Sequence, residues 1–325
     1  MKDFKNKVAA ITGAASGMGR TLAVELARRG CHLALSDVNE KGLAETAQLA
    51  GKLGVKVTTK KLDVANREAV FAWADEVVRD HGKVNLIFNN AGVALGAFVE
   101  TVKPEDFEWI MGINFWGVVW GTQAFLPHLK RAGEGHVVNT SSLFGLLASP
   151  TQGTYNSSKF AVRGFTEALR QELDMEKCGV SATCVHPGGI RTNIARAAKM
   201  DDSMDKATGG QAEAARSRFD KMLNVTTAES AALQILIQKG VICCRERCGY
   251  YVAPARNVID LNEYKASNAV ILRMGKETHT QLLEFGQMEI TERLGRKTMM
   301  PVGRRILHVH RLRYENDTPI ALERS

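Results

Sequence analysis

The sequence predicts an α/β fold in which a doubly wound, parallel sheet of about seven strands is covered by helices on both faces. Short β-rich runs alternate with longer helical stretches from the start of the chain, which is typical of consecutive βαβ units. Runs such as Val8–Ile11 and Leu86–Phe88 are apolar throughout. Strands with this pattern are buried on both faces, so helices are expected on either side of the sheet.

Six strands and their connecting helices can be placed in order. We expect a seventh strand at Tyr250–Ala253, after a helix at Thr227–Lys239. Residues 1–264 would form a single domain of the Rossmann type, with 190–224 as a lid, and residues 265–325 a C-terminal extension. The other expected strands are Val8–Thr12, Leu33–Ser36, Val57–Lys61, Leu86–Asn89, His136–Thr140 and Ser181–His186, and the helices are Arg20–Arg29, Glu40–Leu53, Arg67–His81, Pro104–Leu129 and Tyr155–Glu176.

Composition excludes several classes of protein. Of the 325 residues, 45% are hydrophobic and 24% charged, as in ordinary globular domains. The net charge of +8 is spread along the chain, which is not the pattern of a nucleic-acid site. We expect no secretion signal, because Met1–Lys7 is polar and a strand pattern begins at Val8. The most apolar stretch, Ile110–Leu126, is interrupted by Asn114 and Gln123, so no membrane span is expected.

The six cysteines lack the spacing of a disulfide framework, which favours a reducing compartment and a cytoplasmic location. Cys243, Cys244 and Cys248 lie close together in the sequence, but no fourth Cys or His is near them. A tetrahedral zinc site needs four ligands, so we expect no metal.

A glycine-rich turn follows the first strand and leads directly into a helix. Its spacing is Gly13-x3-Gly17-x-Gly19, with Ser16 and Met18 between the glycines. Glycines let the backbone approach a pyrophosphate, and the free N–H groups of the helix N-terminus attract its charge. Alone, this spacing is equally consistent with a plain βα turn.

Asp37 ends the second strand, where a carboxylate can bind the ribose hydroxyls of adenosine and repel a 2′-phosphate. This favours NAD over NADP. The alternative is that Asp37 forms the turn or caps the helix that begins near Glu40.

Further motifs accompany this loop, and together they carry a family resemblance. In order and spacing, the chain resembles the short-chain dehydrogenase/reductase family over roughly residues 5 to 264. The residues that carry the resemblance are Thr12–Gly19, Asp63 and Val64, Asn89–Gly92, Asn114, Ser142, Tyr155-x3-Lys159, and Pro187 and Gly188.

The resemblance implies a catalytic group of Asn114, Ser142, Tyr155 and Lys159. Tyr155 and Lys159 are four apart on an expected helix and so share one face. A free tyrosine has a pKa near ~10. We expect the Lys159 ammonium and an oxidised nicotinamide to lower that pKa, so that Tyr155 acts as acid and base on an alcohol or ketone.

By resemblance, Ser142 would bind the substrate oxygen. Ser141 is the alternative if the match to the family's motif is shifted by one residue. Asn114 would hold a water that links Lys159 to solvent, or serve a structural role. Asn89 would tie strands together, and His186 is interpreted as structural. The cofactor contacts implied by the resemblance are Gly13, Ser16, Gly17, Met18, Gly19, Asp37, Asp63, Val64, Asn90, Ala91, Gly92, Tyr155, Lys159, Pro187, Gly188, Ile190 and Thr192.

The sequence therefore predicts an NAD-dependent oxidoreductase that transfers a hydride between the cofactor and an alcohol or ketone. The alternatives are a non-catalytic protein that senses NAD(H) or binds a partner, and an isomerase or dehydratase on the same fold. Leu, Phe and Met in 94–98, 143–150 and 190–224 indicate an apolar substrate.

The helices Pro104–Leu129 and Tyr155–Glu176 would form the contacts of a homodimer or homotetramer, as is usual in the family. The extension beyond residue 264 has no α/β periodicity. It could bind a partner, cover the site, or be a translated segment without selected structure.

Overall fold

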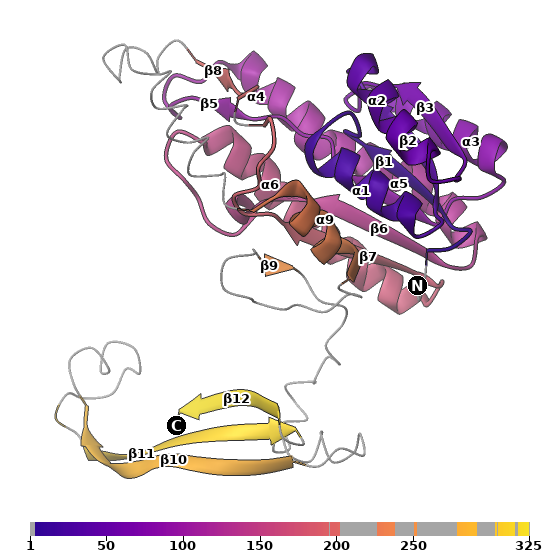
Figure 1. The fold of residues 1–325 in the computed structure, drawn as a ribbon. Coiled ribbons are helices and arrows are strands. Elements are labelled where there is room, and N and C mark those ends of the chain that lie inside the picture. Colours follow the sequence, from indigo (N-terminus) through magenta and orange to yellow (C-terminus); the bar gives the residue numbers. More distant parts are fainter. Residues whose placement is uncertain are drawn as a thin grey trace. The chain divides into compact units, whose positions relative to one another are not determined.

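The computed structural model describes residues 4–194, 196–201, 226–237, 250–251, 278–290, 303, 305–315 and 318–324. The chain divides into two compact units, Met1–Ala255 and Arg256–Ser325. The first holds the seven-stranded sheet and the second a separate sheet of three strands (Figure 1).

The first unit is an α/β structure whose sheet has the strand order β3-β2-β1-β4-β6-β7-β9. Strands β3 to β7 in this order pair in parallel, as predicted. The seventh strand was expected at Tyr250–Ala253; its described part, β9, pairs with β7 but is antiparallel, and Val252 and Ala253 lie outside the described residues. The strands are β1 (Val8–Thr12), β2 (His32–Asp37), β3 (Val57–Lys61), β4 (Leu86–Asn89), β6 (Gly135–Thr140), β7 (Val180–His186) and β9 (Tyr250–Tyr251).

Helices cover both faces of this sheet (Figure 1). One apolar core joins α1, α2 and α9 to the strands, and a second joins α3, α5 and α6 to the opposite face. Successive residues of β1 alternate between them, since Ala9 and Ile11 pack in the first core and Val8 and Ala10 in the second. The helices are α1 (Gly17–Arg28), α2 (Glu40–Gly51), α3 (Arg67–His81), α4 (Pro104–Met111), α5 (Gly117–Arg131), α6 (Gly153–Glu176) and α9 (Ala228–Ile237).

The helix expected at Pro104–Leu129 is interrupted. A π-helical turn, η1 (Gly112–Trp116), separates α4 from α5. Asn114 lies in this turn, is fully buried, and exchanges hydrogen bonds with the backbone of Val93. A polar side chain buried in an apolar helix needs such partners, and a π-turn in a helix is often found at a functional site.

A small parallel pair, β5 (Leu95–Gly96) and β8 (Lys199–Met200), joins the end of the described lid segment to the body of the unit. Lys199 also forms a salt bridge with the buried Asp106 of α4. The remainder of the predicted lid, Ala195 and 202–224, lies outside the described residues.

The second unit contains an antiparallel sheet of β10 (Thr278–Glu289), β11 (Arg305–Glu315) and β12 (Thr318–Arg324). An antiparallel meander of this kind is consistent with the lack of α/β periodicity in the sequence.

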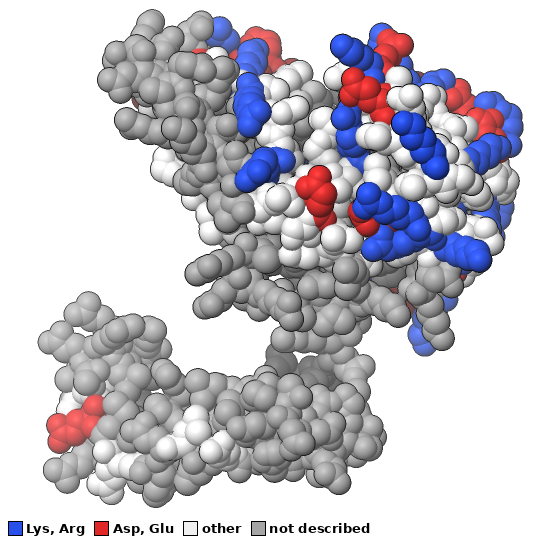
Figure 2. Space-filling view, in the orientation of Figure 1, with Lys and Arg blue, Asp and Glu red and all other residues white. Residues whose placement is uncertain are grey.

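Charged side chains of both signs are mixed on the face of the first unit seen in Figure 2. Several of them are paired: Glu25 binds Arg28 and Arg29, and Arg20 binds Glu45. Nowhere in the described part of the chain is a helix long and apolar enough to cross a membrane.

Candidate active site

The site lies where the strand order changes direction. Strands β2 and β3 extend to one side of β1, and β4, β6 and β7 to the other. The loops that leave β1 and β4 diverge at this point, and ligands of open α/β sheets bind in the crevice between such loops.

The glycine turn after β1 is built so that side chains are excluded. Gly13 and Gly17 have φ angles of +65° and +51°, which favour glycine. At Gly19, a Cβ atom would lie 2.0 Å from the carbonyl oxygen of Gly13. The turn therefore presents bare backbone at the N-terminus of α1, and the side chain of the N-cap residue Ser16 makes no capping hydrogen bond. This cradle fits the pyrophosphate of a dinucleotide.

Asp37 is tied to that turn. Its Oδ2 accepts a hydrogen bond from the Ala15 N–H at 2.9 Å, and its Oδ1 accepts one from the Asn39 N–H at 2.9 Å. The N-cap of α2 is Asn39, whose side chain accepts from Gly42, so Asp37 stabilises the turn but does not cap the helix.

Arg20, the cation next to the glycine turn, already has partners within the protein. It donates to the carbonyl oxygen of Ala15 at 2.6 Å and pairs with Glu45. Because Arg20 is already paired, it is not an obvious cation for a 2′-phosphate beside Asp37.

The loop after β4 is joined to the glycine turn by hydrogen bonds. The Thr12 hydroxyl accepts from the N–H groups of both Asn90 and Ala91 at 3.0 Å. The Asn90 amide donates back to the carbonyl oxygens of Thr12 and Gly13. The two loops expected to hold a cofactor therefore form one connected structure.

Gly92, Asn114 and Lys159 lie close together. A Cβ atom at Gly92 would be 3.2 Å from Oδ1 of Asn114 and 3.4 Å from Nζ of Lys159, so a side chain there would crowd both. Asn89 instead ties strands together, as interpreted from the sequence, because its amide donates to Asn139 of β6 at 2.8 Å.

Asp63 and Val64 follow β3 and do not line the pocket that holds Ser142, Tyr155 and Lys159. The Asp63 carboxylate accepts from the Ala65 N–H at 3.0 Å, and Val64 is buried against Gly117. Their adenine contacts stay a prediction.

Tyr155 and Lys159 project from the first turns of α6 into the same pocket. The Lys159 ammonium is buried, lies 5.6 Å from the centre of the Tyr155 ring, and donates to the carbonyl oxygen of Thr140 at 3.0 Å. Burial lowers the pKa of Lys159 from 10.5 to about 8.

The pKa of Tyr155 moves in the opposite direction to the one we expected. Burial raises it above its ordinary value of 10.0, while a hydrogen bond with Ser142 acts in the lowering direction. Desolvation of the phenolate therefore outweighs the stabilising contacts that the pocket's own residues supply.

The structure distinguishes the two candidate serines. The Ser141 hydroxyl donates to the backbone carbonyl of Lys159 at 2.8 Å and so holds α6 in place. The Ser142 oxygen accepts from the Phe144 N–H at 3.1 Å, and Ser142 is the side chain that acts to lower the pKa of Tyr155. Ser142 is therefore the serine that lies beside the tyrosine.

The amide of Asn114 is almost fully used by protein partners. Its Oδ1 accepts from Val93, and its Nδ2 donates to Val93 and to the hydroxyl of Ser158. Both amide protons are engaged, so the side chain could bind a water only through its remaining acceptor capacity. The structural interpretation of Asn114 gains support from these contacts.

His186 lies directly behind Ser142 and is completely buried. Its Nδ1 is 3.0 Å from the Ser142 carbonyl oxygen, a contact in which only a protonated nitrogen can donate. Burial lowers the pKa of His186, which favours a neutral ring with its proton on Nδ1. This geometry fits a structural role.

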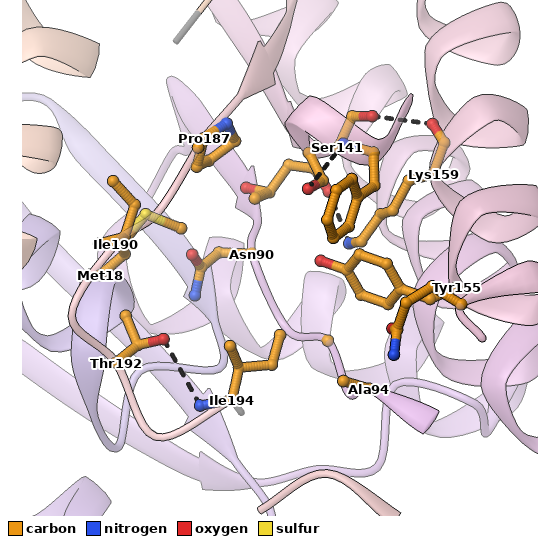
Figure 3. A pocket seen from close by; sticks show the side chains of 16 residues that line it. Met18, Asn90, Ala94, Ser141, Tyr155, Lys159, Pro187, Ile190, Thr192 and Ile194 are labelled. Atoms are coloured by element: carbon orange, nitrogen blue, oxygen red, sulfur yellow. Dashed lines mark hydrogen bonds between the residues drawn. The ribbon is translucent and has the colours of Figure 1, made fainter. Parts of the chain in front are cut away.

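One pocket collects most of the predicted residues (Figure 3). Tyr155 and Lys159 face Met18, Ile190 and Thr192 across it. Several predicted residues do not line it. Gly13, Ser16, Gly17 and Gly19 form the adjoining turn, Asp37 and Ala91 form hydrogen bonds with the backbone of Ala15 and the hydroxyl of Thr12, and Asn114 lies in η1. The sequence interpretation did not single out Thr140 or Gln152. The lining residues are Met18, Asn90, Gly92, Ala94, Thr140, Ser141, Ser142, Phe144, Gln152, Tyr155, Lys159, Pro187, Gly188, Ile190, Thr192 and Ile194.

No group of three or more His, Cys, Asp or Glu side chains suited to a metal ion is found among the residues that the structure describes. The cysteines at 243, 244 and 248 lie outside them.

Comparisons with known proteins agree with this geometry. Residues 7–203 match the family model for short chain dehydrogenases, and the chain belongs to this family of oxidoreductases. "Putative oxidoreductase SadH" of Mycobacterium tuberculosis is 51% identical over 236 residues, which are 73% of this chain and 83% of that protein. Estradiol 17-beta-dehydrogenase 11 of Homo sapiens is 36% identical over 194 residues, which are 59% of this chain and 65% of that protein.

Among solved structures, a short chain dehydrogenase/reductase from Burkholderia phymatum in complex with NAD is 33% identical, with a TM-score of 0.61, and the match covers 73% of this chain and 94% of that one. A short chain dehydrogenase from Mycobacterium paratuberculosis bound to NAD is 26% identical, with a TM-score of 0.62 and coverage of 72% and 91%.

The C-terminal unit has a different relationship. Residues 273–325 match the family model of the UTRA domain, which the sequence interpretation did not anticipate.

Proposed function

We propose that the protein is an NAD-dependent dehydrogenase or reductase that interconverts an apolar alcohol and its ketone, with Tyr155 as acid and base. The observation that carries the proposal is the convergence of Ser142, Tyr155 and Lys159 on a pocket that continues into the glycine turn. A protein that only binds the dinucleotide would not need all three groups around one reacting position.

The residues present fit a nicotinamide dinucleotide. The turn at Gly13–Gly19 would hold the pyrophosphate, Asp37 the adenosine ribose, Asp63 and Val64 the adenine, and the loop at Asn90–Gly92 would form the floor. Lys159 would bind the nicotinamide ribose, and Pro187, Gly188, Ile190 and Thr192 the carboxamide. Asp37 favours NAD over NADP because a carboxylate repels a 2′-phosphate. When bound, the oxidised nicotinamide supplies a hydride acceptor at its C4 atom.

In the oxidative direction, Tyr155 as phenolate takes the proton of the substrate hydroxyl, and the carbon that bears this hydroxyl would give its hydride to the oxidised nicotinamide, leaving a ketone. The Ser142 hydroxyl donates to the substrate oxygen and fixes its position. In reduction, the Tyr155 hydroxyl gives its proton to the ketone oxygen. The raised pKa of Tyr155 suits the second direction at neutral pH, since the hydroxyl form is the proton donor.

Apolar side chains form much of the pocket around this position, namely Met18, Ala94, Phe144, Ile190 and Ile194. Such a lining favours a hydrophobic substrate body. The similarity to a protein named as an estradiol dehydrogenase is consistent with this class.

The test is NADH formation by the purified protein with primary, secondary and steroid alcohols, in the presence of NAD or NADP. Tyr155→Phe should abolish turnover and leave NAD affinity unchanged, and Asp37→Ser should raise the relative use of NADP. Tight NAD binding without turnover on any substrate would instead favour the sensing protein. Isomerisation without net NADH production would favour the isomerase.

We further propose a homodimer or homotetramer in a reducing, cytoplasmic environment. Trp109, Trp116 and Phe160 are each more than one third exposed on α4, η1 and α6, and a self-associating surface would cover them. Cys31, Cys178 and Cys184 are free thiols. A monomeric mass in light scattering would contradict the assembly.

A further inference from the structure

We propose that the substrate carries a second neutral oxygen, a hydroxyl or carbonyl group close to the reacting carbon, and that the amide of Gln152 binds it. The inference rests on the proposed dehydrogenase function and makes the substrate class more specific. It assigns a substrate-recognition role to Gln152.

The position of Gln152 is fixed by its backbone. It is the N-cap residue of α6, three residues before Tyr155. Its carbonyl oxygen accepts from the Asn156 N–H at 2.7 Å, and it forms a β-bridge with Ala97. Residues three apart at a helix start lie close together, so Gln152 and Tyr155 can contact two groups of one small molecule.

The side chain of Gln152 forms part of the pocket wall. The residue is 9% exposed, lines the pocket, and its amide makes no hydrogen bond to any residue that the structure describes. The other amide in the pocket, that of Asn90, donates to the carbonyl oxygens of Thr12 and Gly13. An amide that lines the pocket and has no protein partner among the described residues can form hydrogen bonds with a group of a bound ligand.

The surroundings of Gln152 define what its partner can be. Its Nε2 lies 3.7 Å from the position of a Cβ atom at Gly96, beside the sulfur of Met200. Among the residues that the structure describes, Lys159 is the only charged side chain that lines the pocket, and its ammonium already donates to the Thr140 carbonyl oxygen. An anionic substrate group would lack a counter-charge, so a hydroxyl or carbonyl is the matching partner.

The place of Gln152 also separates it from the cofactor residues. Gly96 and Ala97 adjoin it, whereas Met18 and Thr192 adjoin the glycine turn. In Figure 3, Tyr155 and Ala94 lie across the pocket from Met18 and Thr192. The group that Gln152 contacts therefore belongs to the substrate.

The experiment compares kcat/KM for cyclohexanol with that for its vicinal diol and for the isomers whose hydroxyls lie further apart, using the full chain and NAD. The wild type should prefer one of the diols. Gln152→Met keeps the length of the side chain and removes its hydrogen bonds, so the ratio of diol to cyclohexanol kcat/KM should fall about tenfold, the effect of one neutral hydrogen bond.

Two further variants separate recognition from folding. Gln171→Met changes an exposed glutamine on the same helix and should leave the ratio unchanged. Gln152→Glu keeps an acceptor for a hydroxyl, so it should retain diol preference that Gln152→Met loses. A ratio that is the same in wild type and Gln152→Met overturns the inference alone, as does a wild-type preference for cyclohexanol over every diol. No turnover with any of these alcohols overturns the proposed function as well.

Discussion

The buried Lys159 ammonium should lower the free energy of unfolding at neutral pH. This destabilisation should disappear as the pH rises and the ammonium loses its proton. Its pKa falls from 10.5 to about 8 because the ammonium is buried. This corresponds to about 3 kcal/mol of preference for the neutral amine in the folded state. Between the two values the unfolded chain binds the proton and the folded chain does not, so the free energy of unfolding increases with pH.

The perturbation is Lys159→Met, which removes the titrating group and keeps most of the apolar stem. The free energy of unfolding of both proteins would be measured by urea denaturation at intervals from neutral pH to above 10.5. The wild-type value minus the Lys159→Met value should rise by about 3 kcal/mol across the window from about 8 to 10.5. Other titrating groups cancel in the difference to the extent that they do not interact with Lys159.

Lys61→Met is the control with the opposite sign. Lys61 is exposed, and its pair with Glu40 raises its pKa. The stabilisation from the charged Lys61 is present below its pKa and lost as the pH rises through it. The wild-type free energy of unfolding minus that of Lys61→Met should therefore not increase with pH. A flat or falling difference for Lys159→Met would refute the argument that burial destabilises its charge.

Three further predictions follow from the site. The kcat/KM of alcohol oxidation should rise with pH above neutral, because Tyr155 must be a phenolate to accept the proton and its pKa is raised. The kcat/KM of ketone reduction should fall over the same range, because the Tyr155 hydroxyl that donates the proton is lost. Parallel pH profiles for the two directions would contradict the assignment. Gly19→Ala should lower the free energy of unfolding by about 1–3 kcal/mol in denaturation experiments and weaken NAD binding in calorimetry, because the new Cβ would overlap the Gly13 carbonyl oxygen. His186→Phe should reduce kcat about tenfold while NAD affinity is kept, because Ser142 loses the donor to its carbonyl; an unchanged kcat would exclude this positioning role.

The sequence predicts the layered fold well because its strands are either wholly apolar or followed by diagnostic turns. Val8–Thr12 and Leu86–Asn89 were placed at their observed bounds for this reason. The break in the helix at Gly112–Trp116 could not be predicted in the same way. It depends on the bonds between Asn114 and Val93, a tertiary contact that periodicity does not encode.

In the candidate site, too, some residues could be predicted from the sequence and others could not. The glycines, Tyr155 and Lys159 occur in a fixed spacing, so they could be named from the sequence as candidate site residues. Gln152 and Thr140 could not, since Thr140 contributes through its backbone carbonyl and Gln152 through its position beside Gly96. The sign of the pKa change at Tyr155 was also out of reach, because it depends on how completely the ring is desolvated.

The buried polar residues explain how a sheet held mainly by apolar packing positions the groups that we propose as catalytic. Apolar contacts are not directional and leave the loops at the strand ends free to shift. Here, the Thr12 hydroxyl fixes the loop after β4 through two N–H groups, and the Ser141 hydroxyl fixes α6 through the carbonyl of Lys159. Each bond joins the end of one strand to the next functional segment. Hydrogen bonds are directional, so the segments that carry Asn90, Ser142 and Lys159 are held in one relative arrangement before any ligand binds.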